Sequence, residues 1–568
     1  MDGSMEYLIL TGAICIFVIL VFFLEWKRNS AEEKQFIKKL YEDYEALSEK
    51  EYAPERFARM GSYYERHKKE GQIDDITWND LEMDDLFRRM NYTLSASGEE
   101  YLYYVLRTPK LDTGELRRLE EGVTFFGENP KERVRIQLLL RKLGYTGKFS
   151  LYDYLEHLED LGERSNRKNI FCNLLFLPLI GCLWVNFSLG VLGIVILTIY
   201  NILTYFREKA EIDPYIVSFA YIIRLLDVCD ELKKNPLPVC QEEWECIKKN
   251  RSALQGIRRN SIWVMSPTRG NSSGDIISLF MDYIRMVFHV DLLQFNKMLG
   301  CLRGHMQEID ALIGTVGYLE SLIAIWIFRT SLKEGYCLPE FKPFQEGENQ
   351  FLLEECYHPL LKHPVKNSIC MEKGVLLTGS NASGKSTFLK TVAVNAILSQ
   401  SVNTCMAKKY EAPLFHVYSS MALRDNMDSG ESYYIVEIKA LRRILDAAEQ
   451  EKIPVLCFVD EVLRGTNTVE RIAASTQILK FLRKRKVFCF AATHDIELTE
   501  LLGEEYENYH FEESLENGDV VFHYRLLPGR ASTRNAIRLL EMMGYEKEIT
   551  ENAARQAQEF VQTGNWRS

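Results

Sequence analysis

The apolar residues of this chain follow three different patterns along its length. Residues 7–24 and 170–206 are runs with almost no charge, whereas residues 29–165 and 214–330 repeat apolar residues at helical spacing between charged ones. Beyond residue 370, short apolar runs end in glycine or polar residues. Long uncharged runs are typical of membrane spans, and short apolar runs are typical of strands buried on both faces of a parallel sheet. The pattern therefore predicts membrane-spanning helices, a helical region and a C-terminal α/β domain.

The first uncharged run, residues 7–24, is close to the roughly 20 residues that one membrane-spanning helix needs. A cleaved signal peptide would have basic residues before the apolar run and small residues at a cleavage site after it, and this run has neither. Lys27 and Arg28 follow the run, and basic residues favour the cytoplasmic side. We therefore expect an uncleaved anchor whose carboxyl end lies in the cytoplasm.

The second uncharged run, residues 170–206, is too long for one span and fits two short helices joined by a turn. Asn186, Ser188 and Gly190 interrupt it near the middle. Basic residues lie on both flanks, which requires an even number of crossings. We expect a transmembrane hairpin, with a buried helical pair as the alternative. The chain would then be a multi-pass protein of the cell membrane with three transmembrane helices and a cytoplasmic C-terminal domain.

Five segments follow from these patterns. A chain of 568 residues exceeds what one hydrophobic core holds, and the extended, proline-containing stretch 334–341 marks a boundary. The expected segments are an anchor (1–28), a cytoplasmic helical region (29–169), the hairpin (170–206), a helical core or lever domain (207–341) and the α/β domain (342–568).

The net charge and the cysteine content argue against two kinds of binding site. The net charge of −11 and the isoelectric point of about 5.6 argue against a broad electrostatic surface for nucleic acid. The 13 cysteines are scattered and form neither CxxC pairs nor Cys/His clusters. Scattered cysteines within apolar runs are typical of a reducing compartment, and they argue against a zinc site.

The first candidate for chemistry lies at residues 374–387, where a short apolar run leads through small residues into a helical pattern. The spacing matches G-x-x-x-x-G-K-S/T, the phosphate-binding loop between a strand and a helix. Gly379 and Gly384 allow positive φ, so that backbone N–H groups can point at phosphate oxygens. Lys385 would reach the β- and γ-phosphates, and Ser386 would hold Mg²⁺. The alternative is a Gly/Ser-rich turn with one exposed lysine.

Two further apolar runs end in polar residues of the kind that a nucleotide site requires. Residues 454–459 lead to Asp460 and Glu461, and residues 487–492 lead to Thr493 and His494. Asp460 would help hold Mg²⁺, Glu461 would orient or deprotonate the attacking water, and His494 would sense the γ-phosphate. Three strands with polar carboxyl ends predict a nucleotide crevice in a parallel sheet. The predicted fold is an α/β P-loop NTPase domain, with a mostly parallel sheet and helices on both faces. An all-α lever or core region and N-terminal transmembrane helices precede it.

The C-terminal region resembles the MutS family of mismatch-repair ATPases. Residues 378–387, TGSNASGKST, are similar to that family's TGPNMGGKST, and residues 460–468, DEVLRGTNT, are similar to its DEIGRGTST. Further similar segments are 356–360 (CYHPL), 428–437 (DSGESYYIVE), 492–494 (ATH) and 529–532 (GRAS). The resemblance is strong over 340–560 and weaker over 275–341 and 80–110. It implies an ATP hydrolase that acts as a dimer through its ATPase domains.

The resemblance also assigns roles to individual residues. It implies that Asn381 contacts phosphate, that His358 lies near the base, and that Ser432 reaches into the nucleotide site of the partner subunit. Without it, His358 reads as a loop histidine and Ser432 as a turn residue. The site implied for ATP and Mg²⁺ comprises Gly379, Asn381, Gly384, Lys385, Ser386, Thr387, His358, Asp460, Glu461, His494 and, in trans, Ser432.

This sequence departs from the family pattern in ways that leave two functions open. It has no N-terminal module with a Phe-x-Glu mismatch wedge, its lever region is short, and Leu463 stands where the family has glycine. One function is ATP-driven rearrangement on mismatched or branched DNA in repair. The other is a membrane switch or scaffold that acts on a protein or lipid partner without DNA. Arg464 reads equally well as a surface residue or as a nucleotide-sensing cation.

Overall fold

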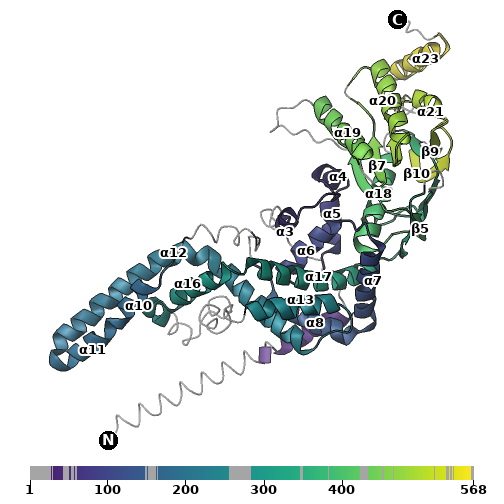
Figure 1. The fold of residues 1–568 in the computed structure, drawn as a ribbon. Helices are drawn as coiled ribbons and strands as arrows, with labels where there is room; N and C mark the ends of the chain where they lie inside the picture. The colour runs from purple at the N-terminus through teal and green to yellow at the C-terminus, as the bar shows by residue number, and fades with distance from the viewer. Residues whose placement is uncertain are drawn as a thin grey trace. The chain divides into compact units, whose positions relative to one another are not determined.

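The computed structural model describes residues 27–28, 30–42, 60–146, 164–254, 283–345, 350–380, 383–421, 433–450, 453–464, 466–516, 519–531 and 543–563, with a few single residues between them. The chain forms two compact units (Figure 1). The helical unit comprises Met1–Ser62, Asn91–Tyr101 and Gly122–Ile327, and the sheet unit comprises Tyr63–Met90, Leu102–Glu121 and Phe328–Ser568. The predicted anchor at 7–24 lies outside the described residues.

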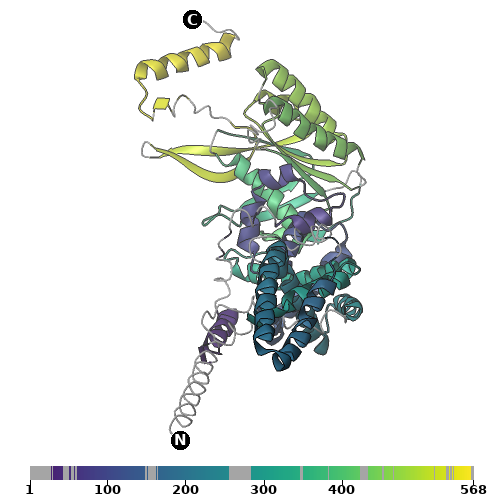
Figure 2. The same ribbon diagram turned by 90° about the vertical axis from the view of Figure 1, so that its left-hand side faces the viewer.

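The sheet unit contains a six-stranded sheet with the order β10-β9-β4-β8-β7-β6. Five of these strands run parallel, and β10 pairs antiparallel with β9 to form the long two-stranded ribbon visible in Figure 2. The strands are β4 (Gly374–Thr378), β6 (His416–Ser420), β7 (Val455–Asp460), β8 (Val487–Ala492), β9 (Tyr506–Glu516) and β10 (Asp519–Pro528). The three strands predicted at 375–377, 454–459 and 487–492 are therefore confirmed as neighbours in one sheet.

A second sheet of four strands has the order β1-β5-β2-β3. Its strands are β1 (Glu340–Phe341), β2 (Phe351–Cys356), β3 (Asn367–Met371) and β5 (Lys409–Ala412). The helices of the sheet unit are α3 (Ser62–Arg66), α4 (Asp75–Asp80), α5 (Met83–Met90), α18 (Lys385–Val402), α19 (Tyr433–Gln450), α20 (Thr468–Arg483), α21 (Glu497–Leu501) and α23 (Lys547–Thr563).

The six-stranded sheet is buried on both faces at β7 and β8, because β8 and the residues of β7 before Asp460 are apolar at every position. Val455, Cys457 and Val459 of β7 belong to a core cluster with residues of α19, α20 and α21. The intervening Phe458 stacks on Phe490 of β8, which in turn contacts Phe351 of the four-stranded sheet. Successive side chains of a strand point to opposite faces, so a continuous apolar run fills both layers.

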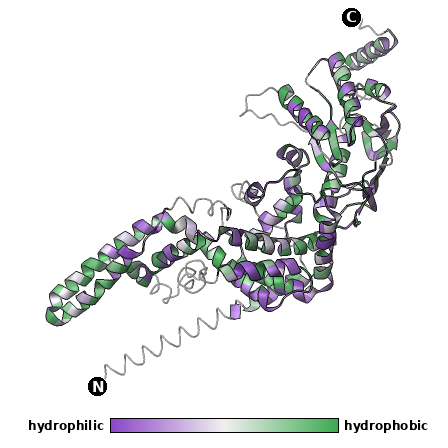
Figure 3. Cartoon of the chain, in the orientation of Figure 1, coloured by the Kyte–Doolittle hydropathy of each residue, from purple (hydrophilic) through white to green (hydrophobic). Residues whose placement is uncertain are grey.

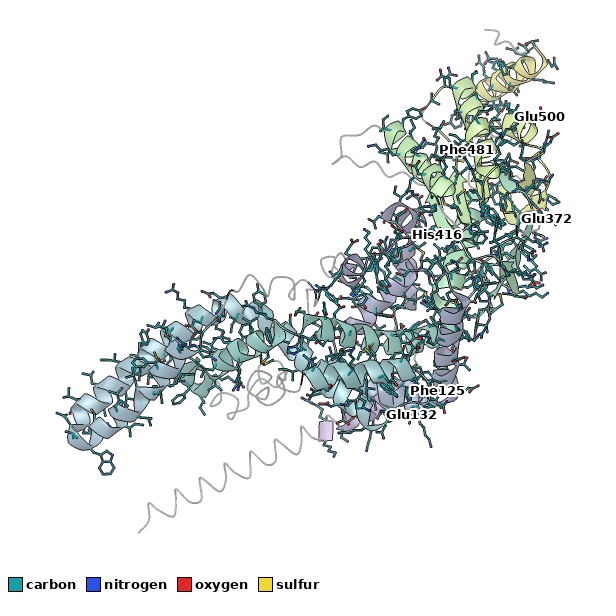
Figure 4. The ribbon with its side chains drawn as sticks, viewed as in Figure 1. Phe125, Glu132, Glu372, His416, Phe481 and Glu500 are labelled. Atoms are coloured by element: carbon teal, nitrogen blue, oxygen red, sulfur yellow. The ribbon has the colours of Figure 1, made fainter. Side chains whose placement is uncertain are left out.

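Two short N-terminal segments complete the sheet unit. α4 packs against the edge strand β6, where Asp80 accepts hydrogen bonds from the Ser419 hydroxyl (2.6 Å) and from the Met421 amide (2.9 Å). A Cβ atom on Gly71 would lie 2.1 Å from Cε1 of His416, the residue labelled at the start of β6 in Figure 4, so the approach requires glycine. The edge of the parallel sheet is thus covered by a helix from far upstream in the chain.

The end of α17 (Met306–Ser331) is fastened to the end of α18 by one buried arginine. The Arg329 guanidinium, 4% exposed, forms a two-pronged ion pair with Glu120 at 2.7 and 2.8 Å. It also donates to the carbonyl oxygens of Val402 (3.2 Å) and Asn403 (2.9 Å), which end α18. A cation at these carbonyls also matches the negative end of the helix dipole.

Replacing Arg329 with alanine is expected to lower the free energy of unfolding by about 3–5 kcal/mol, because Glu120 would be left as a partly buried charge without its partner. Arg329→Lys should recover only part of the loss, since an ammonium cannot bind a carboxylate with two prongs. Denaturant unfolding of the full chain in detergent measures both. Arg442→Ala, which removes an exposed ion pair with Asp446, should change stability by less than about 1 kcal/mol. Equal losses for Arg329 and Arg442 would contradict the expectation.

Every described element of the helical unit is a helix. They are α8 (Pro130–Leu143), α10 (Arg167–Leu174), α11 (Phe176–Val185), α12 (Phe187–Lys234), α13 (Gln241–Ala253), α16 (Val290–Leu302) and most of α17, together with parts of α6 (Ala96–Arg107) and α7 (Thr113–Glu128). Within the helical pattern of residues 29–165, α7 and α8 are separate helices because Pro130 starts a new one. Within the pattern of residues 214–330, α16 begins directly after His289, which has φ +54°.

The uncharged run 170–206 folds as a hairpin. α11 and α12 meet at Asn186, whose side chain accepts a hydrogen bond from the Leu189 amide at 3.2 Å. A Cβ atom on Gly190 would lie 2.8 Å from the backbone nitrogen of Leu183, so glycine lets the two helices approach closely. The apolar side chains point outward, with Trp184 91% exposed, and Figure 3 shows α11 and the adjoining part of α12 mostly in the apolar colour.

Among the residues that the structure describes, three helical segments are long and apolar enough to cross a membrane by length and composition: Arg167–Val185, Phe187–Ile212 and Met306–Ser331. The third differs from the other two, because 78% of its apolar window is buried inside the protein against 17% for each of the others. α17 is therefore a core helix, and its apolar residues pack against protein. The observed architecture is a mixed α/β chain with a helical N-terminal region and a sheet of mostly parallel strands, as predicted at that level.

Candidate active site

The carboxyl ends of β4, β7 and β8 bring the predicted site residues together. Leu377 of β4 and Asp460 of β7 both pair with Ala492 of β8. The Glu461 amide donates to the Ala492 carbonyl, and the Thr493 amide donates to the Leu377 carbonyl, both at 2.9 Å. These bonds extend the sheet by one residue past each strand, so the segments that follow the three strands emerge side by side.

The segment between β4 and α18 has the backbone geometry that a phosphate-binding loop needs. Gly379 has φ +144° and Gly384 has φ +110°, and a Cβ atom on Gly379 would lie 2.9 Å from the Phe511 carbonyl oxygen. α18 begins at Lys385, so its unpaired N–H groups and positive dipole end face the loop. Of the predicted loop residues, Thr387 is exposed at the start of α18, and Asn381 lies outside the described residues.

Lys385 folds back over this loop. Its ammonium group donates to the carbonyl oxygens of Gly379 and Ser380, each at 2.8 Å. Burial lowers the pKa of Lys385, and the carboxylates of Asp460 and Glu461 oppose that shift. A buried ammonium group that donates to carbonyl oxygens is well placed to accept an anionic ligand, because phosphate oxygens accept the same hydrogen bonds and carry the opposite charge.

Ser386 and Asp460 form the candidate metal site. The Ser386 hydroxyl donates to the Asp460 carboxylate at 2.5 Å. Burial raises the pKa of Asp460, while the Ser386 hydrogen bond, Arg464 and Lys385 lower it. Both side chains offer oxygen, which Mg²⁺ prefers, and a site of one or two protein oxygens completed by substrate phosphates and water is typical of Mg²⁺. Among the described residues no group of three or more His, Cys, Asp or Glu side chains is arranged to hold a metal alone.

Glu461 lies between two cationic or hydrogen-bonding partners. Its Oε1 is 2.8 Å from Nε2 of His494, and its Oε2 pairs with the Arg464 guanidinium. Burial by itself raises the pKa of Glu461, but the contacts with His494 and Arg464 outweigh it and bring the pKa below its usual value. The Glu461 carboxylate is therefore charged at neutral pH and can accept a proton or a hydrogen bond from water. Arg464, which the sequence left open, is thus a partner of the acid pair.

His358 lies apart from the strand ends, in the turn after β2. It is 7% exposed, and its Nδ1 accepts a hydrogen bond from the Leu360 amide at 3.4 Å. Burial, together with the nearby Lys390 of α18 and against the opposing effect of Glu82, lowers the pKa of His358 to about 4. The imidazole is therefore neutral at physiological pH. Ser432, the other residue assigned through the resemblance, lies outside the described residues immediately before α19.

A depressed histidine pKa predicts a specific loss of stability in acid. Between about pH 6.5 and pH 4 the unfolded chain binds a proton at residue 358 that the folded chain does not, so stability falls as the pH falls through this window, by up to about 3 kcal/mol. His358→Gln should remove that part of the pH dependence, as measured by denaturant unfolding of the full chain at several pH values. The exposed neighbour His363, changed to glutamine, should leave the wild-type dependence unchanged. Identical acid sensitivity in His358→Gln and wild type would refute the prediction.

Two residues beside the loop, Glu513 and Tyr524, were not predicted from the sequence. The Ser380 hydroxyl donates to the Glu513 carboxylate of β9 at 3.0 Å, and the ring of Tyr524 on β10 lies 3.1 Å from where a Cβ atom on Gly384 would be. Both reach the loop because β9 pairs with β4, with His510 opposite Thr378. No local pattern in residues 506–528 predicts that pairing, since it depends on which strand end lies next to β4.

Comparison with known proteins extends this picture. The family model of MutS domain V matches residues 375–561, from β4 to α23. The DNA mismatch repair protein MutS of Thermus thermophilus is 33% identical over 228 residues, which is 39% of this chain and 27% of that protein. MutS of Lactobacillus delbrueckii subsp. bulgaricus is 26% identical over 273 residues (46% of this chain, 31% of that protein). DNA mismatch repair protein MutS 2 of Haloarcula marismortui is 32% identical over 182 residues (31% of this chain, 19% of that protein).

The matched region and its fold define a mixed α/β domain of the MutS domain V type. These matches support the resemblance to the MutS family that the sequence motifs indicated. The chain spans less than a third of the length of these relatives, and the family model matches residues 375–561 in its C-terminal part.

Proposed function

We propose that this chain is an ATP hydrolase whose C-terminal domain is a P-loop NTPase domain. The observation that carries the proposal is the convergence of Lys385, Ser386, Asp460, Glu461 and His494 at three adjacent carboxyl ends of parallel strands. The resemblance to the MutS family implies an ATP hydrolase, and the residues present fit Mg·ATP. Gly379, Asn381, Gly384 and Thr387 would line the phosphates, and Ser386 and Asp460 would hold Mg²⁺, which neutralises phosphate charge when bound.

In this proposal Lys385, Glu461 and His494 have distinct roles. Lys385 exchanges its bonds to the Gly379 and Ser380 carbonyls for phosphate oxygens, which relieves the cost of its burial. Glu461 orients the attacking water and accepts its proton. His494, which touches Glu461 at 2.8 Å, keeps the carboxylate pointing to the strand ends and stands where it can sense the terminal phosphate.

We also propose that two copies act together. The resemblance implies that Ser432 reaches into the partner subunit's nucleotide site, and α19 begins directly after it at Tyr433. A homodimer through the ATPase domains would then complete each site in trans. ATP binding would favour the dimer, and hydrolysis would release it, so that turnover moves the helices attached to the ATPase domain.

Membrane attachment is the next part of the proposal. The outward apolar side chains of α11 and α12 support a hairpin that enters the bilayer, since a contiguous exposed apolar surface of this kind is otherwise costly. Together with the anchor at 1–28 this gives three transmembrane helices in the cell membrane. The helical region 29–169, the lever domain 207–341 and the ATPase domain 342–568 would lie in the cytoplasm.

Two kinds of ligand for the lever domain are supported by different observations. The resemblance to the MutS family supports DNA, mismatched or branched, as in repair. The net charge of −11 and the apolar hairpin support a membrane switch that acts on a protein or lipid partner. Phosphate contacts release counterions, so DNA binding that weakens steeply with salt would identify the first.

The decisive experiment uses the full chain purified in detergent. Mg²⁺-dependent release of phosphate from ATP is expected, and its absence under conditions where the chain is folded would overturn the hydrolase proposal. The same preparation, titrated with duplex and branched DNA at graded salt, separates the two ligands. Binding with a steep salt dependence supports DNA, and no binding supports the membrane switch.

A further inference from the structure

The turn that follows Asp460 has an unusual backbone. Glu461 and Leu463 both have φ +58°, in the left-handed region. A residue other than glycine is strained in this region, because its Cβ atom crowds the backbone. Leu463 is also buried in the core between the sheet and α19–α21, so its side chain gains contacts in this conformation. A strained turn beside a candidate catalytic acid needs something that holds it in place.

A buried carboxylate on α19 does this. Glu437 lies on the second turn of that helix and is 4% exposed. Its Oε1 accepts a hydrogen bond from the Arg464 amide at 3.2 Å, and the Leu463 amide also faces the carboxylate. Its Oε2 is buried and has no hydrogen-bond partner among the described residues. Burial raises the pKa of Glu437, whereas the Arg464 and Leu463 amides lower it.

The contacts of Glu437 and those of Glu461 meet at Arg464. The Arg464 backbone is bound by Glu437, and its guanidinium pairs with Oε2 of Glu461. One carboxylate on α19 and one in the turn therefore bind the backbone and the side chain of the same residue. The same Glu461 carboxylate that pairs with Arg464 lies 2.8 Å from Nε2 of His494.

We propose that Glu437 is a positioning residue for ATP hydrolysis. It holds residues 461–464 in their left-handed turn and thereby aims Glu461 at the attacking water. The inference rests on the hydrolase proposed above and deepens it.

The position of Glu437 also gives the turn a connection to the partner subunit. α19 begins at Tyr433, directly after Ser432, and Glu437 lies about one turn further along the same helix. A helix moves as a rigid element, so a shift of its first turn displaces the Glu437 carboxylate as well.

The test uses four variants of the full chain in detergent: Glu437→Ala, Glu437→Gln, Leu463→Gly and the double variant Glu437→Ala/Leu463→Gly. kcat and KM for ATP, retention of Mg·ATP and the unfolding midpoint are measured for each. Glu437→Ala should lower kcat by about 100-fold and change KM by less than about threefold, as expected for a misplaced catalytic group. Glu437→Gln should retain most of kcat, because its amide oxygen still accepts from the Arg464 amide.

The double variant separates positioning from simple stability. Glycine adopts φ +58° without strain, so Leu463→Gly should restore kcat at least tenfold in the Glu437→Ala background, although it removes buried side-chain volume and lowers the unfolding midpoint. A structural role for Glu437 predicts the reverse, a double variant that is both less stable and less active than either single one. That result, or an unchanged kcat in Glu437→Ala, would overturn the proposal. Asp446→Ala, an exposed carboxylate on the same helix, is the matched control and should leave kcat unchanged.

The outcomes also distinguish this inference from the function it rests on. If the wild-type chain binds and hydrolyses no ATP, the hydrolase proposal itself fails. If the wild type is active and the Glu437 series shows no kcat loss or no rescue, only the positioning role fails.

Discussion

Replacing Lys385 with alanine is expected to reduce ATP hydrolysis by at least about 100-fold, to the background of the assay. The physical reason is charge. Lys385 is buried at the start of α18 between the loop carbonyls and two carboxylates, and the alanine variant would leave the acidic strand ends facing a polyanion without this cation. Phosphate release and binding of a fluorescent ATP analogue by the full chain in detergent measure the effect on hydrolysis and on affinity.

The Lys385 experiment needs a variant that loses an equal charge elsewhere. Lys373→Ala removes an exposed lysine immediately before β4 and should keep wild-type turnover. The fold of Lys385→Ala is checked by its unfolding midpoint, since the loop carbonyls can turn to water once the ammonium group is gone. Unchanged turnover in a folded Lys385→Ala protein would remove the P-loop assignment.

Replacing Glu461 with alanine is expected to separate ATP binding from hydrolysis. Binding should persist because Lys385, Ser386 and Asp460 stay in place, whereas kcat should fall by about 100- to 1,000-fold for lack of a group that accepts the proton of water. The unhydrolysed ATP would then keep the ATPase domains of two subunits associated. Size-exclusion chromatography with light scattering in detergent should show an ATP-dependent dimer that persists in the variant and dissociates in the wild type as ATP is consumed.

A nearby carboxylate provides the control for Glu461. Glu497 is exposed at the start of α21, a few residues beyond His494, and Glu497→Ala should hydrolyse ATP at the wild-type rate. A Glu461→Ala protein that holds ATP and stays monomeric would argue against completion of the site by Ser432 of a second subunit. A variant that hydrolyses ATP normally would show that another group activates the water.

Much of the site was predictable because each strand has a clear local pattern. The apolar runs that became β4, β7 and β8 are continuous, and glycine, an acidic residue and Thr493 respectively end them at the sites where the chain leaves the sheet. Parallel strands that lie side by side have their carboxyl ends on one edge of the sheet, so the sequence predicts that Ser386, Asp460 and Glu461 lie close together. The hairpin at 170–206 was predictable for the same reason, since the turn residue Asn186 lies inside an uncharged run.

Other contacts could not be predicted, because their partners are remote and their patterns are ordinary. Asp80 reads as one acid among many on a charged helix, yet it is buried against Ser419 of β6. Glu437 ends the segment 428–437 that resembles the family, but no local pattern indicates that it is buried. The left-handed backbone of Leu463 contradicts local preference and is held by packing and by Glu437. Likewise α17 has the composition of a membrane span, but the helices packed around it make it a core helix.

The sequence by itself determined the local elements and the chemistry at their ends: a glycine-rich turn before a helix, two acids after a buried strand and an uncharged hairpin. These depend on short-range preferences for backbone angles, apolar periodicity and charge, which act within a few residues. Only the tertiary structure decided which strand lies beside β4, which upstream helix covers β6, and which buried carboxylate holds the turn at Glu461. These arrangements depend on packing between surfaces that lie far apart in the chain. Many residues share the same local pattern, so the pattern alone does not identify which of them makes the contact.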